Sequence, residues 1–131
     1  MVANLMTNVP ARDAFSVAVQ AINGRLTAGA GGPAVLSVQI GTLPAGALIL
    51  GINTNVETAL VGTTPTFNLG TTAAGVDIAA GIALTAGTVT TPPIAALVNP
   101  VVADTAVWAN ITGTPTAGDA YVSVQFVKPA S

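Results

Sequence analysis

Side chains that carry most protein chemistry are scarce in this chain of 131 residues. It has no cysteine and no histidine, and only 6% of its residues are charged, whereas a typical soluble domain has about 25%. The absence of cysteine excludes a disulfide framework. The absence of both residue types excludes most nucleophile–base pairs and most zinc sites. Composition therefore favours a structural protein over an enzyme.

The few charged residues also limit the partners and cofactors that we expect. The three basic residues, Arg12, Arg25 and Lys128, are scattered, and the formal net charge is −2. Nucleic-acid binding needs clustered Lys and Arg, so we expect no nucleic acid. The acidic residues are Asp13, Glu57, Asp77, Asp104 and Asp119. Their spacing fits neither a calcium loop nor a paired-carboxylate site, so we interpret them as turn and strand-end residues and expect no metal and no cofactor.

Long uninterrupted hydrophobic runs are also missing, although 51% of the residues are hydrophobic. The uncharged stretch 26–56 is long enough to cross a bilayer, but glycine and proline interrupt it at Gly29, Gly31, Pro33 and Pro44. A membrane-spanning helix needs about 20 mostly apolar residues in a row. We therefore expect no membrane partner.

Alternation of apolar and polar residues is the main pattern that is present, and period two is typical of half-buried strands. The alternating segments are 15–21, 36–40, 48–56, 67–69, 107–111 and 120–126. In the last of these, Val122, Val124 and Phe126 are predicted to be buried, with Ser123 and Gln125 more exposed.

For one further segment we predict which residues face the core, and for another whether it forms a strand or a helix. In 48–56 the pattern places Leu48, Leu50 and Ile52 on the buried face. The stretch 12–22 also fits an amphipathic helix, but we favour a strand because Phe15, Val17 and Val19 alternate and residues of these types favour strands.

Turn residues separate these segments. Asn23-Gly24 is a hairpin-type dipeptide, and 43–46, 62–65 and 113–118 are rich in Gly, Pro and Thr, which favour turns. The stretch 75–100 predicts short strands and a long excursion. Short strands joined by such turns indicate an all-β fold. We predict a single antiparallel β-sandwich, in the form of a jelly roll, over residues 13–131, with an N-terminal arm over residues 1–12.

Five residues are candidates for an interface with a capsid or another subunit. Trp108 and Tyr121 fall on strand faces opposite the apolar ones, where an aromatic side chain can contact a partner protein or stack on a sugar. Leu5 and Met6 are apolar residues of a kind that disordered tails avoid. We expect them to anchor the arm on the capsid or a neighbouring subunit, with Arg12 as an ion-pair partner.

Several segments carry a resemblance to a known family. They are TLPAGALILGI (42–52), VETAL (56–60), TPTFNLGT (64–71), ANITG (109–113) and TAGDAYVSVQF (116–126). Over roughly residues 41–127 the chain resembles the capsid decoration, or head cement, proteins of tailed bacteriophages. The resemblance implies a jelly roll, a homotrimer on the outer surface of the capsid, the major capsid protein as partner, and no catalytic residues. The alternative is a glycan- or receptor-binding β-sandwich module of a phage fibre or tail.

Overall fold

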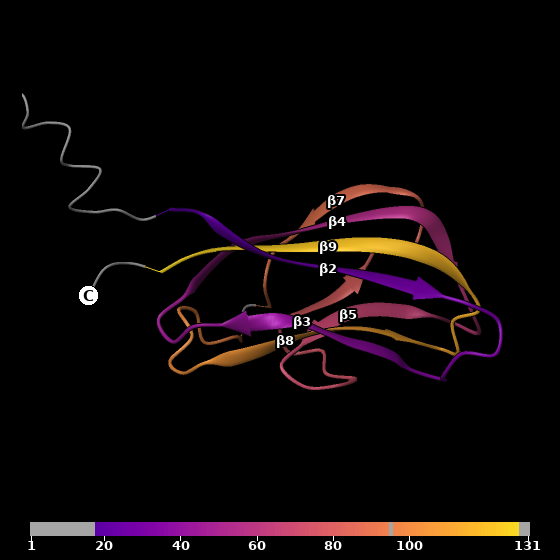
Figure 1. Cartoon of the computed structure of the whole chain (residues 1–131), viewed down its shortest axis with the longest axis horizontal. Helices are drawn as coiled ribbons and strands as arrows, with labels where there is room; N and C mark the ends of the chain where they lie inside the picture. Colours follow the sequence, from indigo (N-terminus) through magenta and orange to yellow (C-terminus); the bar gives the residue numbers. More distant parts are fainter. Residues whose placement is uncertain (1–17, 95, 129–131) are drawn as a thin grey trace, which may run out of the picture.

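The computed structural model describes residues 18–94 and 96–128, and all regular structure in these ranges is β-strand. Eight strands form two four-stranded sheets that lie face to face (Figure 1). One sheet has the order β2-β9-β4-β7 and the other has the order β3-β8-β5-β6. The strands are β2 (Gln20–Ala28), β3 (Leu36–Leu43), β4 (Leu48–Val61), β5 (Thr66–Gly70), β6 (Ala79–Ile82), β7 (Gly87–Thr91), β8 (Thr105–Thr112) and β9 (Ala117–Val127).

The pairing of the strands defines the topology. Strand β2 pairs with β9, β3 with β8, β4 with β7 and β5 with β6, and every one of these pairs is antiparallel. The first four strands thus pair with the last four in reverse order, as if one long hairpin had been wrapped across two sheets. Two four-stranded sheets connected in this way form a jelly roll. The predicted all-β, antiparallel sandwich is confirmed.

The core lies between the sheets and follows the predicted alternation on β9 and β8. Val122 and Val124 are fully buried and Phe126 is nearly so, whereas Ser123 and Gln125 are partly exposed. Phe67 of β5 closes the core from the other sheet and is fully buried. The prediction for β9 is therefore correct.

Strand β2 differs from the prediction in its extent and its buried face. Residues 20–22 lie in a strand, as favoured over a helix, but Asn23-Gly24 is not a turn: Asn23 pairs with Ser123 in mid-strand. A Cβ on Gly24 would collide with Ile40 of β3, and one on Gly41 would lie 2.6 Å from Cγ2 of Ile22. Glycine is required here because the two sheets approach closely at this edge.

The exposed side of β2 also corrects the prediction. Val19 is largely exposed, just before the strand, and Ala21 is exposed within it. The alternating face predicted from Phe15, Val17 and Val19 is thus the outer one where it is described. Ile22 and Leu26 face the core instead. Phe15 and Val17 lie outside the described residues.

Strand β4 contains a bulge that reverses the predicted phase at its start. Ile49 is opposite Phe126 and Gly51 is opposite Gln125, so Leu50 is an extra residue without a partner. A bulge of this kind shifts the alternation by one position. Ile49 is consequently buried, and Leu50, predicted to be buried, is 50% exposed.

The predicted turns at 43–46 and 62–65 connect strands as expected, and β9 begins inside the segment 113–118. The stretch 75–100 contains β6, β7 and the start of a long connection, also as expected. That connection, residues 92–104, packs against the β3–β4 turn: the N–H of Gly46 donates to the carbonyl of Val101 (2.7 Å). The described N- and C-terminal residues leave the sandwich at this end (Figure 1), which we call the terminal end.

Candidate interaction surfaces

The outer face of the β2-β9-β4-β7 sheet carries rows of polar side chains. Strand register places Arg25, Tyr121, Asn55 and Thr88 in one row across the four strands. The Thr88 hydroxyl donates to Oδ1 of Asn55 (3.4 Å). A parallel row ends in a shorter bond, from the Thr90 hydroxyl to Oδ1 of Asn53 (2.8 Å). Uncharged groups that bond one another along a flat sheet give a polar face with little net charge.

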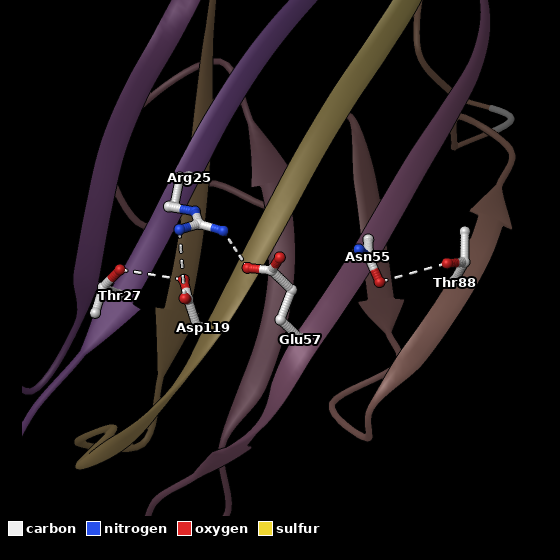
Figure 2. A network of polar contacts seen from close by, with 6 residues as sticks. All are labelled: Arg25, Thr27, Asn55, Glu57, Thr88 and Asp119. Carbon is white, nitrogen blue, oxygen red and sulfur yellow. Dashed lines mark hydrogen bonds and ion pairs between the residues drawn. The ribbon is translucent and has the colours of Figure 1, made fainter.

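Arg25 is the centre of the ionic contacts on this face (Figure 2). Its guanidinium pairs with Glu57 of β4, and its Nη1 lies 3.6 Å from Oδ2 of Asp119 on β9. The hydroxyl of Thr27 donates to the same carboxylate (3.2 Å), and the guanidinium carbon lies 5.9 Å from the centre of the Tyr121 ring. One cation thus compensates two carboxylates on adjacent strands.

This arrangement does not have the form of a catalytic carboxylate pair. A glycosidase holds its substrate in a cleft between two carboxylates, but here both Glu57 and Asp119 are ion-paired to Arg25 (Figure 2). Neither carboxylate lines the hollow beside Val98 and Val102 or the one beside Gly29 and Pro115. Within the described residues, no group of three or more acidic side chains could hold a metal ion.

The two candidate aromatic residues lie on different sheets. Tyr121 is on β9 and is 43% exposed, whereas Trp108 is on β8 and is partly buried. Both point outward, because their neighbours Val107 and Val122 are buried in the core between the sheets. Their rings therefore face opposite sides of the sandwich and do not form a shared stacking platform.

The outer face of the β3-β8-β5-β6 sheet is covered by the β5–β6 connection. The side-chain amide of Asn110 on β8 holds this connection from both sides: its Oδ1 accepts from the N–H of Ala74 (2.9 Å), and its Nδ2 donates to the carbonyl of Gly75 (2.8 Å). Its neighbour Asn68 accepts from the N–H of Gly81 (3.1 Å). We call this the covered sheet, and β2-β9-β4-β7 the open sheet.

The burial of these two amides was not anticipated from the sequence. Asn110 is fully buried and Asn68 nearly so, although both point away from the core. The sequence does contain a signal: each asparagine stands between apolar residues of its strand. The two asparagines also pair with each other across β5 and β8. A buried amide must be satisfied by hydrogen bonds, and the connection that covers it supplies them.

Asp77 fixes the far part of the same connection. Its carboxylate accepts from the backbone N–H of Thr71 (2.8 Å) and from the Thr71 hydroxyl (2.7 Å). Partial desolvation would raise the pKa of Asp77, but these hydrogen bonds from Thr71 and one from its own N–H outweigh it, so the pKa is lowered from 3.8. The ionised carboxylate therefore stabilises the folded form of the β5–β6 connection.

A hollow of about 330 Å³ lies at the terminal end. Ile94, Leu97 and Val101 form part of its apolar lining, and Thr71 and Asp77 contribute polar groups. Two further lining residues, Val98 and Val102, are 63% and 84% exposed. Large apolar side chains exposed together mark interaction surfaces more often than a single exposed one does.

The other three predicted interface residues, Leu5, Met6 and Arg12, lie outside the described residues, as does the predicted boundary between residues 12 and 13.

Across residues 18–94 and 96–128, no helix is long and apolar enough to cross a membrane.

Comparison with known proteins places this architecture among virus capsid chains. No protein-family model matches the chain, and no curated protein matches its sequence. The fold matches a chain of the cyanophage Pam1 capsid asymmetric unit (TM-score 0.62, 19% identity, 86% of each chain covered). It also matches a chain of the capsid of Ralstonia phage GP4 (TM-score 0.61, 19% identity, covering 88% of this chain and 86% of that one).

A third match is a chain of the acid-stable capsid of the Helicobacter pylori bacteriophage KHP30 (TM-score 0.59, 14% identity, covering 86% of this chain and 89% of that one). At these identities the likeness is one of fold. It extends over nearly the whole of each chain, so the jelly roll is shared as a complete domain.

Proposed function

We propose that this protein is a non-enzymatic structural component of a bacteriophage virion that decorates and stabilises the outer surface of the capsid. The observation that carries the proposal is the set of three fold matches, all to chains of phage capsids and all covering at least 86% of both partners. The resemblance of residues 41–127 to decoration proteins supports the same role.

The mechanism in this proposal is mechanical. A decoration protein bridges neighbouring capsid subunits and removes apolar surface from water, which stabilises an assembly by about 25 cal/mol per Å² of buried apolar surface. The open sheet suits a broad contact because its ion pairs are compensated internally around Arg25. Interface cores are depleted in uncompensated charge because burying such charge is costly.

The proposed partners are two further copies of this chain and the major capsid protein. A low fraction of charged residues and several exposed apolar side chains, including Leu50 and Val61, favour permanent association. We expect a homotrimer, so light scattering at micromolar concentration should give about three times the 12.7 kDa chain mass. A stable monomer would contradict permanent self-assembly.

The role on the capsid is tested with heads that lack this protein. Purified protein is mixed with the undecorated heads, bound copies are counted after sedimentation, and resistance of the heads to heat is measured. Saturable binding together with an increase in head stability is the expected result. Binding to the tail or fibre of complete particles, and none to heads, would contradict the proposal.

The fibre-module alternative gains no specific support from the geometry. It depended on Trp108 and Tyr121 acting against a glycan, and these side chains lie on different sheets.

A further inference from the structure

The hollow at the terminal end exposes apolar side chains that a partner could cover. Val102 is 84% exposed and Val98 63% exposed, while Val101, which also lines the hollow, is buried. Apolar side chains of this kind gain stability when covered, by about 25 cal/mol per Å². The hollow therefore has the shape and lining to accept one or two apolar side chains.

The surroundings of the hollow are acidic. Asp77 lines it, and Asp104 lies nearby at the β3–β4 turn, where it accepts from the N–H of Ala45 (2.9 Å). Among the described residues neither carboxylate pairs with a cation, in contrast to Glu57 and Asp119. An occupant that combines apolar side chains with a positive charge would complement both features.

The first described residue, at position 18, lies at this same end, and residues 1–17 precede it in the sequence. Gln20 pairs with Phe126, Phe126 pairs with Ile49, and the N–H of Ile49 donates to Asn99, next to Val98 (2.9 Å). With strands about 4.8 Å apart, the hollow begins roughly 15 Å from Gln20. The fourteen residue-to-residue steps from position 6 to position 20 can span up to about 45 Å, so the distance is no obstacle.

The composition of that preceding segment matches what the hollow lacks. It contains Leu5 and Met6 as neighbouring apolar side chains and Arg12 as a cation. We propose that residues 5–12 of the same chain dock on this surface, with Leu5 and Met6 in the hollow and Arg12 facing Asp77. The tether gives the segment of the same chain an effective concentration near the millimolar range, which favours it over the segment of a separate copy free in solution.

This inference goes beyond the proposed function, because it concerns a contact within the isolated protein and its test needs no capsid. The chain has no cysteine, so two engineered cysteines are the only thiols present. The test compares the rate of disulfide formation in the pair Leu5→Cys and Val102→Cys with that in the pair Leu5→Cys and Leu50→Cys.

Leu50 is a matched control because it is apolar, half exposed and outside the lining of the hollow. It also lies beside Ile49, nearer to the entry of the chain at Gln20. A freely moving tether would therefore react with position 50 at least as fast as with position 102. Docking predicts the reverse, with the 5–102 disulfide forming at least tenfold faster and migrating as a single chain on a denaturing gel.

Two outcomes would overturn the proposal: equal or faster reaction at position 50, or a 5–102 disulfide that links two chains even at high dilution. Two added substitutions test the chemistry of the contact in the 5–102 background. Val98→Asp should remove the rate advantage, since it places a charge in the hollow. Arg12→Gln should reduce the rate several-fold and Arg12→Lys should restore it; an unchanged rate with Arg12→Gln would exclude the ion pair with Asp77.

Discussion

The open and the covered sheet present the same kind of side chain on their outer faces, yet to opposite effect. On the open sheet Asn55 is exposed and bonds Thr88 of the neighbouring strand. On the covered sheet Asn110 is fully buried and bonds the backbone of residues 74 and 75. What differs is a connection that folds over one sheet and not the other. The same residue type is thus part of an available surface in one case and part of the interior in the other.

This difference bears on which surface can meet a partner. A contact on the covered sheet would have to form against the β5–β6 connection, whose position depends on Asn110 and Asp77. A contact on the open sheet would form directly against the strands, whose backbone positions are set by hydrogen bonds along β9 and β4. The open sheet therefore offers the strands themselves to a partner, and we expect substitutions of its outward side chains to affect assembly more than folding.

The largest expected effects come from the core that both sheets share. Phe126→Ala on the open sheet and Phe67→Ala on the covered sheet should each lower the free energy of unfolding by about 3–5 kcal/mol, because both rings are buried between the sheets. Denaturant titration of the two variants checks this. If one substitution left the midpoint unchanged, the sheets would not share a single core.

The second prediction tests the comparison directly. Asn110→Ala should cost about 2–4 kcal/mol, because the N–H of Ala74 and the carbonyl of Gly75 lose their partners in a buried setting. The matched variant Asn55→Ala should cost less than about 0.5 kcal/mol, because solvent replaces its one long bond. Thermal unfolding of both variants gives the two values. An equal loss of stability in the two variants would show that burial of Asn110 under the β5–β6 connection does not add to its contribution.

The third prediction concerns the edge where the open and covered sheets meet. Gly41→Ala should cost about 1–3 kcal/mol, because its new methyl group would press on Ile22 of the other sheet. Gly51→Ala is the control within a sheet: the nearest atom to its Cβ is Cγ2 of Thr90 at 4.0 Å, so its effect should be small. A neutral Gly41→Ala would mean that β2 and β3 can separate without loss.

How far the sequence predicts this arrangement depends on the range of the interaction involved. Alternation predicts the buried faces of β8 and β9 because each pattern is local and unbroken. Alternation does not predict the bulge in β4. Residues 48–50 are all apolar, so the sequence does not show which of them face the core. Asn23-Gly24 is a turn signal on local grounds, but a contact with Ile40 on the other sheet determines its role.

The same reasoning applies to the candidate surfaces. Alternation places Trp108 and Tyr121 outward, but the strand order decides that they face opposite sides. The apolar neighbours of Asn110 along its strand hint at burial, but the connection that buries it comes from 36 residues earlier in the chain. The roles of all five predicted interface residues stay predictions.

The fourth prediction concerns low pH, which should weaken the contacts by which Asp77 holds the β5–β6 connection. The pKa of Asp77 is lower in the folded protein than its ordinary value of 3.8. The ionised carboxylate therefore stabilises the folded state at pH values above the pKa of the unfolded chain. This stabilisation is lost as the pH falls through the lower pKa of the folded protein. Wild type should therefore lose more stability than Asp77→Asn between about pH 5 and pH 2. Parallel melting curves for the two proteins would contradict the role of Asp77 in holding Thr71.

The smallest effect is expected at the charged centre of the open sheet. Arg25→Gln removes the contacts to Glu57 and Asp119, but these groups are substantially exposed, and exposed ion pairs contribute about 0–1 kcal/mol. We expect a loss within that range at low salt and almost none at 1 M salt, where screening acts within about 3 Å. Denaturant titration at the two salt concentrations measures it. A salt-independent loss above 2 kcal/mol would show that Arg25 holds β2 to the sheet, in which case the open face would depend on its side chains as much as the covered face depends on Asn110.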